Sequence, residues 1–155
     1  MTFALHMSKV KILLADDDKE DQLILTDSFS EIGRADSIQF VDDGELLLEY
    51  LHSIPQKEDL PSLIVLDLNM PRMSGTETLT ALKASEEYKH IPVIIYSTSV
   101  NDVEMNKCLE TGAEAYITKP VKYEDSIKTA QYFYDFSLGN HNGVPSVGGP
   151  ATANT

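Results

Sequence analysis

The sequence is poor in cysteine, in positive charge and in long hydrophobic runs, and each scarcity excludes a class of protein. Cys108 is the only cysteine among 155 residues, so no internal disulfide can form, which fits a reducing cytoplasm. No apolar run approaches the roughly 20 residues that a membrane-spanning helix needs. Only 12 lysines and arginines face 25 acidic residues, and the net charge of −13 argues against nucleic acid or membrane as direct partners.

The length and composition are those of one globular domain, with 42% hydrophobic and 24% charged residues. We place this domain at residues 9–136. Residues 1–8 lack the pattern of a signal peptide and are interpreted as an N-terminal extension of the kind that an expression vector adds. Residues 137–155 are rich in Gly, Asn, Ser and Pro without periodic apolar positions, which predicts a flexible tail.

The most informative stretch of the sequence is residues 63–71, which read Leu-Ile-Val-Leu-Asp-Leu-Asn-Met-Pro. Its four consecutive apolar residues predict a strand buried on both faces, and Pro71 prevents the strand from pairing further. Asp67 then lies at the carboxyl end of a central strand, where ligand sites gather in open α/β sheets. Taken alone, this stretch is also compatible with an Asp67 that only caps the next helix.

Four more short apolar runs predict strands, and segments with helical periodicity separate them. Asp18 is expected to start or cap the first helix, and Ser74 with Glu77 forms the capping-box pattern of the third. Strands that alternate with helices predict an α/β fold, a parallel sheet covered on both faces. The strands are expected at residues 10–15, 37–41, 63–66, 92–97 and 115–118, and the helices around 23–32, after Ser74, and over 44–54, 102–110 and 123–136.

Polar side chains follow these strands, and the carboxyl ends of parallel strands share one edge of a sheet. This geometry brings together Asp16, Asp17, Asp67, Ser97 and Lys119. Three clustered carboxylates repel one another, and Mg²⁺, which prefers oxygen ligands, relieves that repulsion. Zinc is not expected, because no cysteine or histidine falls near the acids. A lysine and a hydroxyl opposite the metal predict a phosphoryl site with a carboxylate nucleophile.

The sequence resembles the receiver domains of response regulators in two-component signalling. The resemblance rests on the Asp16-Asp17 pair, on Asp67 in Leu-Asp-Leu-Asn-Met-Pro, on Ser97 after Ile-Ile-Tyr, and on Lys119 before proline. It covers about residues 9–136. It implies a flavodoxin-like, doubly wound, five-stranded parallel sheet in the order 2-1-3-4-5 with five helices, which places the acid pair and Asp67 on neighbouring strands.

The resemblance also implies the roles of the acidic residues. Asp67 would accept a phosphoryl group from a histidine kinase or a phosphotransfer protein. The carboxylates of Asp17 and Asp67 and the backbone carbonyl of Asn69 would bind Mg²⁺, and Asp16 would act mainly through a metal-bound water. Asp18 is given no metal-binding role. The implied protein is a signalling phosphoacceptor and not an enzyme with a separate substrate, since it catalyses only its own phosphorylation and slow dephosphorylation.

The remaining site residues have implied roles as well. Lys119 would pair with the phosphoryl group, and Ser97 would swing to donate a hydrogen bond to it. Tyr116 matches the aromatic switch position that turns inward on activation, while Ser99 and the Asn69 side chain lie where the family tunes self-dephosphorylation. The residues themselves leave simpler alternatives open: a lysine lying along the sheet edge, a strand-end hydroxyl, a core tyrosine and a turn asparagine.

A finer resemblance is to single-domain regulators that partner bacterial phytochromes. It rests on the extended loop of residues 54–61, on Asp42-Asp43-Gly44 at the start of the second helix, and on Tyr-Ser-Thr-Ser at residues 96–99. Ser97 stands where many members have threonine, which keeps the hydroxyl. The implied partner is a sensor histidine kinase, with a bacteriophytochrome among the candidates.

Output is expected to pass through protein contacts, because few residues follow Phe136. The expected surface is formed by the fourth helix, the fifth strand and the fifth helix. The fifth helix carries more aromatic residues than one buried face of a helix needs, which suggests a homodimer through this region. These residues are Tyr123, Tyr132, Tyr134 and Phe136. The alternative is that these aromatic residues complete the core.

Two other functions share the chemistry or the fold expected here. A metal-dependent phosphohydrolase with an aspartate nucleophile needs a second acid two residues later to protonate the leaving group, and Asn69 occupies that place. An interaction module that works without phosphate is compatible with the same fold. It predicts neither a gain of phosphate nor a dependence on Mg²⁺.

Overall fold

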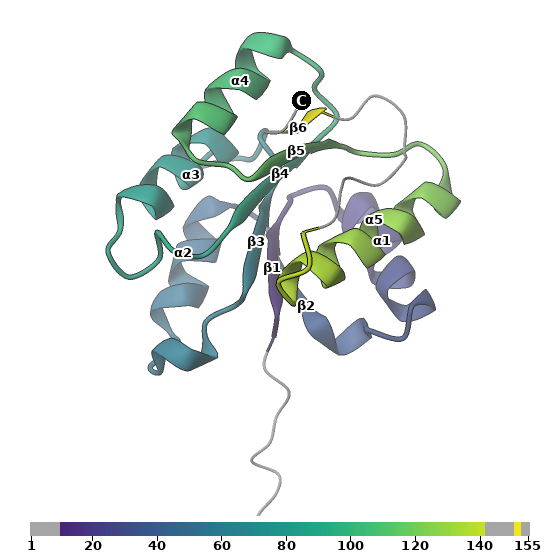
Figure 1. Ribbon diagram of the computed structural model, residues 1–155, viewed down its shortest axis with the longest axis horizontal. Helices are drawn as coiled ribbons and strands as arrows, with labels where there is room; N and C mark the ends of the chain where they lie inside the picture. Colours follow the sequence, from purple (N-terminus) through teal and green to yellow (C-terminus); the bar gives the residue numbers. More distant parts are fainter. Residues whose placement is uncertain (1–9, 142–150, 153–155) are drawn as a thin grey trace, which may run out of the picture.

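Five parallel strands form the centre of the molecule, in the order β2-β1-β3-β4-β5 (Figure 1). This computed structural model describes residues 10–141 and 151–152. All residues of β1 and β3 are buried, as their unbroken apolar sequences predict. The predicted α/β class and strand order are thereby confirmed. The strands are β1 (Ile12–Ala15), β2 (Ile38–Val41), β3 (Leu63–Leu66), β4 (Val93–Ser97) and β5 (Ala115–Thr118).

Five helices cover both faces of the sheet, and each face has its own hydrophobic core (Figure 1). Alternate residues of the strands point to opposite sides, so both faces of the sheet are apolar. Two helices pack on one face and three on the other. In the part of the chain that the structure describes, no helix is both long and apolar enough to cross a membrane. The first face carries α1 (Lys19–Glu31) and α5 (Tyr123–Ser137), and the second carries α2 (Gly44–His52), α3 (Gly75–Ala84) and α4 (Asp102–Thr111).

Local capping sets where the helices begin and end. The Asp18 side chain accepts hydrogen bonds from two backbone N–H groups in the first turn of α1. Ser74 and Glu77 form a reciprocal capping box at α3. Gly33 follows α1 with a φ of 73°, a left-handed conformation that glycine adopts without strain. These contacts confirm the caps predicted for the first and third helices.

The chain departs from the predicted elements in three places. The second helix ends at His52, and a short 3₁₀ helix, η3 (Lys57–Asp59), lies in the loop that follows; another, η2 (Ala35–Ser37), precedes β2. A sixth strand, β6 (Ala151–Thr152), pairs antiparallel with β5. The extension predicted at residues 1–8 lies outside the described residues, and so does most of the tail predicted at 137–155.

Candidate functional site

The strand ends place the predicted site residues at one edge of the sheet. Asp16, Asp67 and Lys119 each follow a strand directly and continue its backbone ladder by one hydrogen bond to the neighbouring strand. Their positions are therefore fixed by the sheet itself. The N···O distances are 3.0 Å from Asp16 to Val41, 3.0 Å from Asp67 to Ala15 and 2.9 Å from Lys119 to Ser97.

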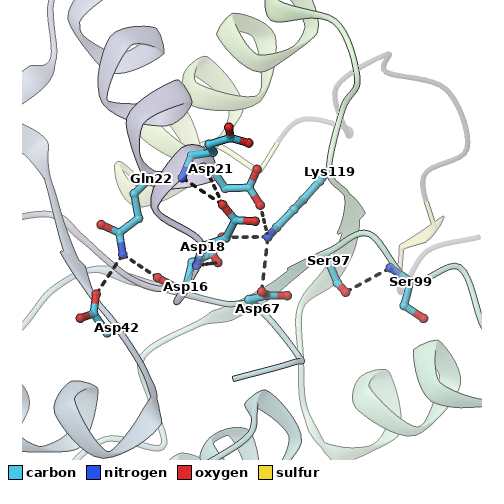
Figure 2. A network of polar contacts seen from close by, with 10 residues as sticks. Asp16, Asp18, Asp21, Gln22, Asp42, Asp67, Ser97, Ser99 and Lys119 are labelled. Atoms are coloured by element: carbon cyan, nitrogen blue, oxygen red, sulfur yellow. Dashed lines mark hydrogen bonds and ion pairs between the residues drawn. The ribbon is translucent and has the colours of Figure 1, made fainter. Parts of the chain in front are cut away.

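Lys119 is the centre of the polar network at this edge (Figure 2). Its side chain is only 8% exposed, and its Nζ atom lies 2.8 Å from Asp16 Oδ2, 2.7 Å from Asp21 Oδ2 and 3.3 Å from Asp67 Oδ2. An ammonium group has three N–H donors, so these carboxylates account for all of them. The lysine is therefore held inside the site and does not simply lie along the sheet edge.

Asp16, Asp17 and Asp67 form a group that could hold a metal ion. Each offers a carboxylate oxygen, and the three oxygens lie within 4.8 Å of one another. Asp16 and Asp67 are buried, while Asp17 is exposed. Carboxylate oxygens with one side open to water fit a hard cation such as Mg²⁺, which keeps several waters when bound. Asn69 is exposed on the loop that follows β3.

Burial and charge set the ionisation of the site. Burial raises the pKa of the Asp16 carboxyl to about 6, and the nearby Asp67 adds to this shift although Lys119 and the Asp18 N–H oppose it. Burial alone would lower the pKa of Lys119, but its ion pairs with Asp16 and Asp21 outweigh burial and raise it. The lysine is therefore protonated throughout the physiological range, and its one positive charge lies among three carboxylates.

Ser97, Ser99 and Tyr116 form a second network that leads away from the acids. The Ser97 hydroxyl oxygen is buried and accepts a hydrogen bond from the Ser99 N–H, 3.2 Å away, so it is turned toward Ser99 (Figure 2). The Tyr116 side chain is fully buried, and its hydroxyl donates to the Ser99 carbonyl at 2.9 Å. Ser99 Oγ donates to Glu104 on α4 at 2.8 Å. The chain of contacts joins the end of β4 to α4 and β5.

Sequence reasoning missed Asp21, although it is one of the three carboxylates on Lys119. It also missed Gln22, whose amide donates to the Asp16 carbonyl at 2.6 Å and to Asp42 Oδ1 at 3.2 Å. Both lie in the first turns of α1. Helical spacing from the Asp18 cap shows that they lie near the strand end, but it does not show which way they point.

Asp43 and Arg72 form another contact that the sequence did not reveal. Asp43 is 1% exposed, accepts from the Leu46 N–H at 3.0 Å as the cap of α2, and forms an ion pair with Arg72. Arg72 has a left-handed φ of 62°, which is uncommon for a residue with a side chain. The pair fastens the loop between β3 and α3, which carries Asn69, to the start of α2.

Comparisons with known proteins agree on one family. The family model described as the response regulator receiver domain matches residues 12–131. A two-component response regulator of rice (Oryza sativa subsp. japonica), ORR5, is 37% identical over 118 residues, which cover 74% of this chain and 81% of that protein.

Two solved structures share both the fold and part of the sequence. The phosphorylated cyanobacterial phytochrome response regulator RcpA is 28% identical with a TM-score of 0.73, over 84% of this chain and 95% of that one. The Mn²⁺-bound form of the response regulator Rcp1 is 28% identical with a TM-score of 0.69, over 87% and 98% of the two chains.

Proposed function

Because this chain belongs to the response regulator receiver domain family, we propose that it accepts a phosphoryl group on Asp67 from a histidine kinase or a phosphotransfer protein. The observation that carries the proposal is the position of Asp67, at the end of the central strand β3, with the Lys119 ammonium 3.3 Å from its carboxylate and two further acids beside it. Phosphoryl transfer depends mainly on positioning and on stabilising charge, and this arrangement supplies both.

In the proposed reaction, an Asp67 carboxylate oxygen forms a bond to phosphorus while the bond from phosphorus to the donor nitrogen breaks. The electron pair of that bond stays on the donor imidazole, whose other ring nitrogen carries a proton, so that a neutral histidine leaves and Asp67 becomes an acyl phosphate. Lys119 supplies a positive charge for the oxygens of the transferred group. Hydrolysis later returns Asp67 to a carboxylate and releases phosphate.

We propose that Asp16, Asp17 and Asp67 hold Mg²⁺, with the Asn69 backbone carbonyl as a further ligand. The bound metal would neutralise the charge that builds up between the carboxylates and the phosphoryl oxygens. The oxygen donor set fits this ion, and the Mn²⁺-bound relative has a comparable fold. Asp16 would act mainly through a metal-bound water.

Ser97 and Tyr116 supply the proposed response to phosphorylation. We propose that the Ser97 hydroxyl swings toward the phosphoryl group to donate a hydrogen bond to it, and thereby gives up the hydrogen bond that it accepts from the Ser99 N–H. That change loosens a segment to which Tyr116 and Glu104 are both hydrogen-bonded. Phosphorylation is thereby coupled to α4 and β5, and Ser99 and the Asn69 side chain are proposed to set a slow rate of self-dephosphorylation.

We propose that a sensor histidine kinase, with a bacteriophytochrome as one candidate, is the upstream partner in the cytoplasm. The likeness to a phytochrome response regulator supports this proposal. The homodimer expected from the aromatic residues of α5 stays a prediction. Phe136 is 5% exposed, and Tyr132 and Tyr134 pack against the core beneath α5, so that most of the supposed excess belongs to the core.

The proposed function is tested by intact mass spectrometry after incubation with acetyl phosphate and Mg²⁺. We expect one phosphoryl-sized mass gain, no gain when the metal is chelated, and no gain in Asp67→Asn. A folded protein that gains no mass with Mg²⁺ present would instead support a phosphate-independent module. If Asp67→Asn consumed acetyl phosphate as fast as the unsubstituted protein does, Asp67 would not be the phosphoryl acceptor.

Mg²⁺ binding is expected to weaken in mild acid. A proton on Asp16 removes a charge that helps to hold the metal, and with a pKa of about 6 the apparent Kd should rise, by at most about tenfold, between pH 7 and pH 5. Calorimetric titration at the two pH values measures the change. In Asp16→Asn the pH dependence should largely disappear, and an unchanged dependence in that variant would contradict the assignment.

A further inference from the structure

Asp21 holds Lys119 more closely than the proposed phosphoacceptor does. The Lys119 Nζ atom lies 2.7 Å from Asp21 Oδ2 but 3.3 Å from Asp67 Oδ2. Figure 2 shows the lysine between these two carboxylates, with Asp21 on the side of α1. Asp21 therefore draws the ammonium group toward the helix and away from the reacting atom.

The position of Asp21 is fixed by the start of α1. Its backbone N–H donates to Asp18 Oδ1 at 3.2 Å, which places it in the capped first turn of the helix. A carboxylate is favoured there, because it complements the positive end of the helix dipole. The side chain is 27% exposed, so its charge is only partly screened by water.

A phosphoryl oxygen on Asp67 would need an N–H donor from Lys119, and all three donors are already used. Asp16 belongs to the group that can hold a metal, and the positive charge of the metal would neutralise the Asp16 carboxylate. Asp21 lies outside that group, so its carboxylate would still attract Lys119 when a metal is bound. Asp21 is therefore the acceptor that competes with the phosphoryl group for the lysine.

We propose that Asp21 is a positioning residue that competes with the phosphoryl group on Asp67 for the Lys119 ammonium, and so limits how strongly the phosphorylated state is held. This inference rests on the proposed phosphoryl acceptance at Asp67. Asp21 does not contact the reacting atoms. It links α1 to the proposed reaction centre only through its ion pair with Lys119.

The test uses beryllofluoride, a phosphoryl mimic, with Mg²⁺ and the full chain, and fluorine NMR to measure its affinity. Asp21→Asn keeps a hydrogen-bond acceptor but removes the charge, and is expected to bind the mimic roughly two- to fivefold more tightly, the range of a partly exposed ion pair. Glu20→Gln is the matched control, because Glu20 is the exposed neighbour on α1 and its loss changes net charge equally. We expect little change in Glu20→Gln.

Three outcomes would overturn the inference. An Asp21→Asn affinity that is unchanged or weaker would show that Asp21 does not compete for Lys119. An equal gain in affinity for beryllofluoride in Glu20→Gln would show a general effect of net charge and no specific role of the Asp21–Lys119 ion pair. Failure of the unsubstituted protein to bind the mimic would overturn the proposed function and this inference with it, a result distinct from the other two.

Discussion

Gly75→Ala is expected to destabilise the fold by at least about 3 kcal/mol and to slow the proposed phosphorylation of Asp67. Gly75 is the first residue of α3 and packs directly on the end of β3. An alanine Cβ there would lie 2.2 Å from the Asp67 carbonyl oxygen and 2.8 Å from the Leu68 Cα. Backbone atoms cannot rotate away as a side chain can. The helix and the strand must move apart, and Asp67 must move with them.

Urea unfolding and the rate of phosphorylation by acetyl phosphate measure these two effects of Gly75→Ala. Gly33→Ala is a suitable control, because Gly33 has a positive φ but no atom within 4 Å of the added Cβ. It should cost about 1 kcal/mol from backbone strain alone and leave phosphorylation unchanged. A Gly75→Ala protein as stable as Gly33→Ala, with normal phosphorylation, would contradict the close approach.

Lys119→Met is expected to lower the phosphorylation rate at least about 100-fold, because it removes the one side-chain cation that contacts Asp67 among the described residues. It should also destabilise the metal-free protein by about 3 kcal/mol at pH 8, where the buried Asp16 is left ionised without its partner. Mg²⁺ should restore much of that stability, since the metal binds only the folded site.

The loss of stability in Lys119→Met should depend on pH. The pKa of Asp16 is already raised to about 6, and losing the ammonium raises it further. An acid with a raised pKa in the folded state stabilises the fold when protonated, and that stability is lost as the pH rises through the folded-state pKa. The free energy of unfolding of the variant should therefore be close to that of the unsubstituted protein near pH 5 and lower than it at pH 8.

Urea unfolding without metal at pH 5 and pH 8 measures this difference. The control is Lys89→Met, which removes an exposed pair with Glu86 and should change stability by less than about 1 kcal/mol at either pH. A penalty in Lys119→Met that is the same at both pH values would show that Asp16 is not the group left uncompensated.

The fold followed from the sequence because its signals are local. Buried strands such as β3 are unbroken apolar runs, and the caps at Asp18 and Ser74 are set by residues within one helical turn. The convergence of Asp16, Asp67 and Lys119 needed only the rule that parallel strands share an edge. The strand order came from family resemblance, because strand counting alone does not supply it.

The remaining features depend on side-chain direction and on close contacts between segments distant in the chain. Lys119 and Asp21 are 98 residues apart, and Arg72 and Asp43 are 29 apart, so no periodic pattern links either pair. The need for glycine at position 75 arises only where α3 meets the backbone of β3. The two-residue strand β6 has no apolar alternation that would distinguish it from a loop.

The most direct test of the central proposal is to locate the phosphoryl group at residue level. The protein is phosphorylated with acetyl phosphate and Mg²⁺, reduced with borohydride, which converts an aspartyl phosphate to homoserine, and digested for peptide mass mapping. Homoserine is expected at position 67, with unmodified aspartate at positions 16, 17 and 21. Homoserine at any of those three positions, with Asp67 unmodified, would contradict the proposal.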